Sequence, residues 1–169
     1  MTLRLILMRH AKSCWTDPLA DDHDRVLNAR GRKAAQDLGD WLRAGGYLPD
    51  LALCSTAMRT RETLERLELD CPTNYEPDLY HAPAGQILTV LQSATANPVI
   101  LLGHNPGIGD FAARILRDPP RDEDFMAFPT GATLVVDFAA TTWAKVGWAK
   151  GTMVDFALPR ALATQSQSA

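Results

Sequence analysis

The sequence predicts an α/β fold, in which helices cover both faces of a mainly parallel sheet. Short apolar runs of strand length alternate along the chain with amphipathic runs of helix length. The 169 residues are enough for one domain with a sizeable core, and they show neither an internal repeat nor a second domain. We therefore expect a three-layer α/β/α sandwich whose central sheet is mainly parallel, with an antiparallel strand near the end of the chain.

Five apolar runs are expected to form the strands of this sheet. The first three are almost continuously apolar, which is typical of parallel strands that are buried on both faces. The last two are expected to pair as an antiparallel hairpin, with a turn near Thr141 and Thr142. The expected strands are residues 3–8, 51–54, 99–102, 132–138 and 145–149.

Four amphipathic runs are expected to form helices between these strands. Asn28 is a good cap for the first helix, which the glycine pair beginning at Gly45 can end. Ser55 is expected to cap the second helix, and the third is expected over residues 84–93. Asn105 stands before a proline, which is typical of a helix start, and apolar residues at helical spacing follow it.

Two long segments are expected to be loops. Residues 11–27 are polar, and residues 118–130 are rich in proline and acids. The first loop carries four aspartates, but their spacing lacks the glycine and the terminal glutamate of an EF-hand calcium loop. We therefore interpret these residues as serving the solubility of the loop: Asp17, Asp21, Asp22 and Asp24. The domain is expected to cover residues 1–160, followed by a frayed tail at 161–169.

Composition and charge argue against several functional classes. A net charge of -3 and a pI of about 5.8 disfavour a nucleic-acid-binding domain, which usually has an excess of basic residues. No apolar run approaches the length of a membrane span. Cys14, Cys54 and Cys71 lack the spacing of a zinc site or of a disulfide framework, which favours a reducing compartment. We expect a cytoplasmic monomer that binds neither nucleic acid nor membranes.

Cationic and imidazole side chains follow three of the predicted strands. Arg9 and His10 end the first strand, Arg59 lies one helical turn beyond the end of the second, and His104 follows the third. The carboxyl ends of parallel strands meet at one edge of a sheet, which is where ligands bind in open α/β folds. Each residue alone is more often structural, but together they match a phosphate dianion and the charge of its transfer transition state. The sequence thus predicts a site for phosphoryl transfer.

Four segments resemble motifs of the histidine phosphatase superfamily, whose members include phosphoglycerate mutases and acid phosphatases. The segments stand in the order of the family and extend over nearly the whole chain: residues 9–13, 27–31, 55–63 and 103–107. The short chain and the Arg-His-Ala form are most similar to the compact, SixA-like branch of phosphohistidine phosphatases. The resemblance therefore implies a phosphoglycerate mutase-like fold and a phosphatase activity.

The resemblance also implies roles for individual residues. His10 would be the nucleophile that becomes a phosphohistidine, and water would then hydrolyse this intermediate. Arg9, Arg59 and His104 would hold the phosphoryl group, and no metal or other cofactor is implied because the arginines supply the positive charge. Further substrate-binding residues are expected to be Lys12, Ser13, Arg25 and Asn105.

The sequence departs from the family pattern at two positions. Ala11 stands where the histidine is usually followed by glycine, and its small side chain meets the same need for room. Many relatives carry a glutamate that protonates the leaving group, but the matching segment, residues 76–82, offers His81 at the best-matched position, with Asp78 and Tyr80 nearby. We list His81 as a catalytic candidate, and a surface-loop histidine is an equally good interpretation. A weak donor suits phosphohistidine, whose imidazole is easier to expel than an alkoxide.

The favoured prediction is a metal-independent phosphatase that acts on a phosphorylated protein carrying phosphohistidine. The alternatives are a small-molecule phosphomonoesterase or mutase of the same superfamily and a non-catalytic module that binds phosphorylated ligands. Binding alone requires no nucleophile, which disfavours the module. A metal hydrolase that uses His10, His81 and His104 would lack the paired carboxylates expected as ligands.

Overall fold

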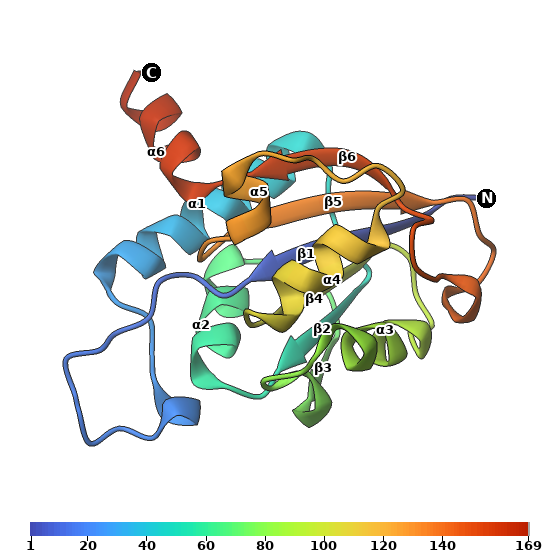
Figure 1. The fold of residues 1–169 in the computed structure, drawn as a ribbon. Coiled ribbons are helices and arrows are strands. Elements are labelled where there is room, and N and C mark those ends of the chain that lie inside the picture. The colour runs from blue at the N-terminus through green and yellow to red at the C-terminus, as the bar shows by residue number, and fades with distance from the viewer. Residues whose placement is uncertain (169) are drawn as a thin grey trace.

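The computed structural model describes residues 1–168, with side chains as far as residue 163, and contains a six-stranded sheet between two layers of helices (Figure 1). The strands lie in the order β3-β2-β4-β1-β5-β6. β1 to β4 are parallel, whereas β5 is antiparallel to both β1 and β6. The predicted fold class is therefore confirmed. The strands are β1 (Leu3–Arg9), β2 (Leu51–Ser55), β3 (Thr73–Glu76), β4 (Val99–Gly103), β5 (Thr133–Phe138) and β6 (Thr152–Ala157).

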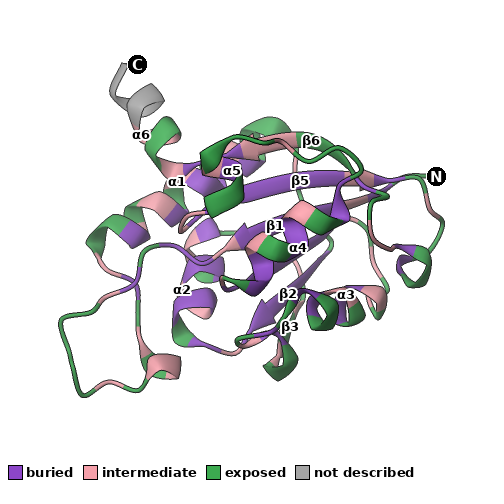
Figure 2. Cartoon of the chain, viewed as in Figure 1, coloured by how far each residue is buried: buried purple, intermediate pink, exposed green. Residues whose placement is uncertain are grey.

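The helices divide into two layers, and each layer covers one face of the sheet. One face packs against α1, α2 and α6, and the other packs against α3, α4 and α5. Figure 2 shows the central strands buried along their length, while the loop before α1 is largely exposed. None of the helices in the described part is long and apolar enough to cross a membrane. The helices are α1 (Ala29–Gly45), α2 (Met58–Leu67), α3 (Ala84–Gln92), α4 (Gly107–Ile115), α5 (Glu123–Ala127) and α6 (Pro159–Ser168).

The first turn of α1 is held against the loop that follows β1. Asn28 caps the helix as predicted, because its side chain accepts a hydrogen bond of 2.8 Å from the backbone N–H of Gly31. A Cβ atom on Gly31 would lie 2.0 Å from the carbonyl oxygen of Lys12, so only glycine allows this approach. The start of α1 thereby supports the loop that leads away from the Arg9–His10 pair.

The edges of the sheet differ from the prediction. The expected strand at residues 145–149 is wrong: a 3-10 turn at Trp143–Lys145 overlaps the start of this segment, and the last strand is β6. Trp143 is an anchor of the segment, since its ring nitrogen donates a 2.6 Å hydrogen bond to the carbonyl of Ala96. The sequence analysis also omitted β3, and α5 lies inside the predicted loop at residues 118–130.

The starts of α2 and α4 also differ from the expected positions. Ser55 is the last residue of β2, and the N-cap position of α2 is Ala57, so the predicted cap is wrong. α4 begins at Gly107, although Asn105 still accepts a 3.1 Å hydrogen bond from the N–H of Gly109. At the end of the chain, α6 covers most of the segment expected to be a frayed tail, and residue 169 lies outside the described residues.

Candidate active site

Two adjacent strands bring His10 and His104 together. β1 and β4 are parallel neighbours with Arg9 opposite Gly103, so the residue after each strand lies at the same edge of the sheet. The N–H of His10 donates a 3.2 Å hydrogen bond to the carbonyl of Gly103. The two imidazole rings are 5.3 Å apart between centroids, and both residues are buried. The structure therefore forms the imidazole pair that the strand ends predict.

The imidazole of His10 is neutral and has a defined tautomer. Burial lowers the pKa of His10 to about 4, and the nearby charges of Arg9 and Arg59 contribute to the shift. Its Nδ1 lies 2.7 Å from the carbonyl oxygen of Ala11. A carbonyl can only accept a hydrogen bond, so Nδ1 carries the proton and Nε2 keeps a free lone pair. This is the protonation state that a nucleophilic histidine requires.

His104 is also held in its neutral form. Burial, together with the nearby charges of His10 and Arg59, lowers the pKa of His104 to about 2. Its Nε2 lies 2.7 Å from the hydroxyl oxygen of Ser55, which explains why Ser55 does not cap α2. The Nδ1 atom is buried and has no hydrogen-bond partner among the described residues, so it is available to a bound oxygen atom.

Two guanidiniums lie beside the histidines. Arg59 lies in the first turn of α2 and is only 6% exposed. Burial lowers the pKa of Arg9, and the positive charge of Arg59 lowers it further, as expected of neighbouring cations. Arg9 Nη1 donates a 3.2 Å hydrogen bond to the carbonyl of Phe128, whereas its buried Nε has no partner in the described part of the chain. The site therefore contains two neighbouring guanidinium groups.

Asp22 is part of this site, so its assignment to loop solubility is wrong. Its Oδ2 atom lies 3.0 Å from Arg59 Nη2 and 3.1 Å from His81 Nε2, and it accepts a hydrogen bond from the hydroxyl of Tyr80. Desolvation opposes ionisation of this carboxyl, but the hydrogen bonds from Tyr80 and Arg59 outweigh it and lower the pKa of Asp22 to about 2. Asp22 is thus an anion bound to the guanidinium of Arg59. Its only sequence signal was its position in the loop that follows the Arg9–His10 pair.

His81 lies at the mouth of the site. Its side chain is 56% exposed, and its ring stacks on Tyr80 with centroids 4.1 Å apart. The ring is 5.8 Å from that of His104. His81 is therefore both exposed and close to His104, and its catalytic role stays a prediction. Asp78 is exposed, and its carbonyl accepts a 2.7 Å hydrogen bond from Gln86.

Comparison with known proteins decides the family. A family model for branch 1 of the histidine phosphatase superfamily matches residues 5–97. The chain belongs to this superfamily. An uncharacterized protein of Mycobacterium tuberculosis H37Rv is 36% identical over 160 residues, which cover 90% of this chain and 100% of that protein. A second uncharacterized relative, from Mycobacterium leprae, is 30% identical over 162 residues, with 90% and 100% covered.

Solved structures support the assignment of this chain to the histidine phosphatase superfamily. A candidate phosphohistidine phosphatase SixA from Nakamurella multipartitia has a TM-score of 0.84 and 28% identity, with 94% of this chain and 97% of that chain covered. A candidate SixA from Agrobacterium tumefaciens has a TM-score of 0.74 and 30% identity, with 93% and 98% covered. The chain is a phosphatase of the SixA-like type.

Three of the expected substrate-binding residues of the phosphatase differ in their exposure and in their contacts. Lys12 is exposed and lines a groove beside the site. Ser13 is buried and forms a β-bridge with Leu27, which is a structural position. Arg25 lies 3.9 Å from Asp22 and places its guanidinium 3.8 Å from the centre of the Trp15 ring. Lys12 is thus open to solvent, whereas the Arg25 side chain is only 13% exposed, and the substrate-binding roles of these residues stay predictions.

Asn105 supports the site of the phosphatase rather than facing it. Its side-chain amide donates hydrogen bonds of 2.9 Å to the carbonyl of Ala127 and 3.0 Å to that of Phe128. The carbonyl of Phe128 also accepts the hydrogen bond from Arg9. Asn105 therefore fixes the segment against which Arg9 rests. Within the described residues, no cluster of three or more His, Cys, Asp or Glu side chains is arranged to hold a metal ion.

Proposed function

We propose that this phosphatase hydrolyses phosphohistidine in proteins, through a phosphohistidine of its own at His10. The observation that carries the proposal is the His10 imidazole, which is neutral at physiological pH and has its proton on Nδ1 beside two guanidiniums. The similarity to candidate SixA phosphohistidine phosphatases supports the choice of substrate class.

In the first step, His10 Nε2 attacks the phosphorus atom of the substrate. A new N–P bond forms while the bond from phosphorus to the substrate imidazole breaks. The substrate ring carries a proton on its other nitrogen, so it leaves with the electron pair as a neutral imidazole. Arg9 and Arg59 hold the non-bridging oxygens and neutralise the charge of the transition state. Asp22 moves away from Arg59 at this stage, since one guanidinium fork cannot hold both anions in the same place.

In the second step, water attacks the phosphohistidine at His10. A P–O bond forms, the N–P bond breaks, and Nε2 recovers its lone pair as inorganic phosphate leaves. The proton that water loses passes to the phosphate or to solvent. We propose that Nδ1 of His104, which has no partner among the described residues, contacts the phosphoryl group in both steps.

The protonation states around the site favour a good leaving group. Asp22 is the carboxyl held in the cluster, and with a pKa of about 2 it is ionised at neutral pH and cannot donate a proton. His81 is the remaining candidate donor, and it is half exposed to solvent. An imidazole leaves phosphorus without strong acid catalysis, whereas an alkoxide needs a proton in the transition state. These features support phosphohistidine over alkyl phosphates.

A small-molecule phosphomonoesterase is the second candidate function. The pairing of His81 Nε2 with Asp22 at 3.1 Å favours it, because a carboxylate can hold the imidazole in an orientation suited to proton donation. Relative rates for a histidine-phosphorylated protein, an aryl phosphate and a sugar phosphate separate the two functions, and the histidine-phosphorylated protein is expected to react fastest.

Trapping the intermediate tests the mechanism. Enzyme denatured in alkali during turnover of a 32P-labelled substrate should retain label that is stable in alkali and lost in acid, as phosphohistidine is. The His10→Ala protein should retain none, and prior treatment with a chelator should leave labelling and turnover unchanged. Absence of label in the wild type, or equal label in both proteins, would reject the proposed mechanism.

A further inference from the structure

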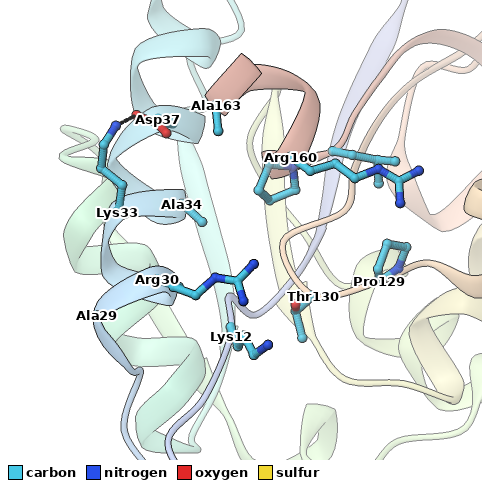
Figure 3. Close-up of a pocket in the computed structure, with 12 residues that line it drawn as sticks. Lys12, Ala29, Arg30, Lys33, Ala34, Asp37, Pro129, Thr130, Arg160 and Ala163 are labelled. Atoms are coloured by element: carbon cyan, nitrogen blue, oxygen red, sulfur yellow. Dashed lines mark hydrogen bonds and ion pairs between the residues drawn. The ribbon is translucent and has the colours of Figure 1, made fainter. Parts of the chain in front are cut away.

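A groove with a volume of about 490 Å³ lies beside the site (Figure 3). Its walls are the first half of α1, the start of α6 and the segment at Pro129 and Thr130. We propose that this groove binds an acidic segment of the polypeptide that carries the phosphorylated histidine. This inference rests on the proposed function, because it assigns a place to the rest of a protein substrate.

The charge of the groove is the first argument. Its lining contains four cationic side chains and one carboxylate, although the whole chain has a net charge of -3. Lys33 is paired with Asp37 on the wall, and Arg160 is paired with Asp124. Lys12 and Arg30 have no carboxylate partner within the described part of the chain, and Figure 3 shows both side chains extending into the gap. These two cations are therefore available to an acidic ligand.

The position of the groove is the second argument. Lys12, on its rim, is two residues after His10 in the chain. On the opposite wall, the N–H of Gly131, which follows Thr130, donates to the carbonyl of His10 at 2.9 Å and to that of Arg9 at 3.2 Å. The Lys12 side of the groove and the side at Pro129 and Thr130 are thus both attached to the end of β1. A polypeptide that presents its phosphoryl group to His10 has neighbouring residues within reach of this groove.

The lining between the cations is the third argument. Its side chains are small or apolar, so a polypeptide backbone can approach closely and bury its own apolar groups there. The groove is also far larger than a single phosphate ion needs. The apolar lining residues are Ala29, Ala34, Pro129, Leu158, Pro159 and Ala163.

Arg30 allows a test that spares the catalytic centre. It is exposed in the first turn of α1, where a glutamate is favoured by the helix dipole, so Arg30→Glu should fold normally. The probes are synthetic peptides with one chemically phosphorylated histidine, flanked by aspartate, asparagine or lysine. Wild-type kcat/KM should favour the aspartate peptide over the asparagine peptide by about two- to fivefold for each charge pair, and added salt should reduce this ratio.

The Arg30→Glu protein should lose this preference and favour the lysine peptide, while its turnover of p-nitrophenyl phosphate stays at the wild-type level. Lys150→Glu is the matched control, because Lys150 is exposed beside the C-terminal end of α4, near the start of β6. It makes the same change in charge and should keep the wild-type preference. Equal rates for the three peptides in the wild type, or an unchanged preference in Arg30→Glu, would overturn the proposal.

A second measurement separates this inference from the proposed function. Unphosphorylated aspartate peptide should inhibit turnover of p-nitrophenyl phosphate more strongly than the asparagine peptide does, in the wild type but not in Arg30→Glu. Turnover of the aryl phosphate without turnover of any phosphopeptide would reject the proposed function alone. Equal inhibition by the two peptides would reject the groove as a docking site.

Discussion

The Oδ2 atom of Asp22 lies 3.0 Å from Nη2 of Arg59, so the guanidinium proposed to hold the substrate is paired with an anion of the protein itself. A second contact strengthens the pairing, since Arg59 Nη1 donates a 2.6 Å hydrogen bond to the backbone carbonyl of Asp22. In the proposed mechanism, the phosphoryl group therefore displaces the Asp22 carboxylate from Arg59 when it binds.

Substitution of Asp22 by asparagine should strengthen the binding of phosphate. The change removes the competing negative charge but keeps the size of the side chain. We expect the inhibition constant of inorganic phosphate to fall by up to about fivefold, the scale of one partly exposed ion pair. Asp24→Asn is the control, because Asp24 lies in the same loop and is mostly exposed. Unchanged or weaker phosphate inhibition in Asp22→Asn would contradict the exchange.

Substitution of Arg59 by lysine should reduce kcat/KM by about 10²-fold, the scale of losing one preorganised electrostatic contact. Lysine keeps the charge but cannot make the two-pronged contact of a guanidinium. Arg61→Lys on the same helix is the control, since Arg61 donates to the carbonyl of Thr56 and lies over the Tyr75 ring. Wild-type activity in Arg59→Lys would remove this residue from the proposed mechanism.

Removal of the His81 imidazole should affect substrates according to their leaving groups. If His81 donates a proton, His81→Ala should slow the hydrolysis of alkyl phosphates by about 10²-fold, within the usual range of general acid catalysis. Aryl phosphates and phosphohistidine need less help and should be slowed much less. A uniform loss across the three substrate classes, measured as kcat, would instead make His81 a binding or structural residue.

The buried histidines should make the protein less stable in mild acid. The pKa values of His10 and His104 are lowered to about 4 and about 2. As the pH falls from about 6.5 to 4, these imidazoles are therefore protonated in the unfolded chain but stay largely neutral in the folded chain. The free energy of unfolding should fall by up to about 1.4 kcal/mol per pH unit for each imidazole. The Asp22 carboxyl, whose pKa is about 2, lowers the free energy of unfolding further only when the pH falls below 3.8, its ordinary pKa.

Urea unfolding at pH 7, 6 and 5 measures this dependence. The His10→Gln protein should have a smaller slope over this range than the wild type, because one of the two imidazoles is absent. An equal slope in the two proteins would mean that other groups dominate acid unfolding.

The sequence predicts the centre of the sheet and the residues at its carboxyl edge, because these depend on local pattern. β1, β2 and β4 are mostly apolar and buried on both faces, and each ends at or directly before a polar residue of the site. The edge strands lack this signal. β3 is polar, and the first three residues of β6 are exposed, so neither alternates as a half-buried strand does.

The remaining differences come from contacts between residues far apart in the chain. Ser55 has the chemistry of a helix cap, but its hydroxyl faces an imidazole that arrives 49 residues later. Asp22 is one of four similar aspartates, and only the path of its loop brings it to Arg59, 37 residues away. Neither periodicity nor spacing in the sequence predicts contacts of this kind, because they depend on the tertiary structure.

The hydrogen bond that holds the proton of His10 is made by a main-chain oxygen, that of Ala11. A main-chain oxygen is present whatever side chain stands at position 11, so the tautomer of His10 does not depend on the chemistry of that side chain. Ala11 is fully buried, and its own N–H is bound to the hydroxyl of Thr63 at 3.0 Å, which limits any shift of the peptide. The constraint on the side chain at position 11 is therefore its volume, because the atom that holds the proton of His10 belongs to the main chain.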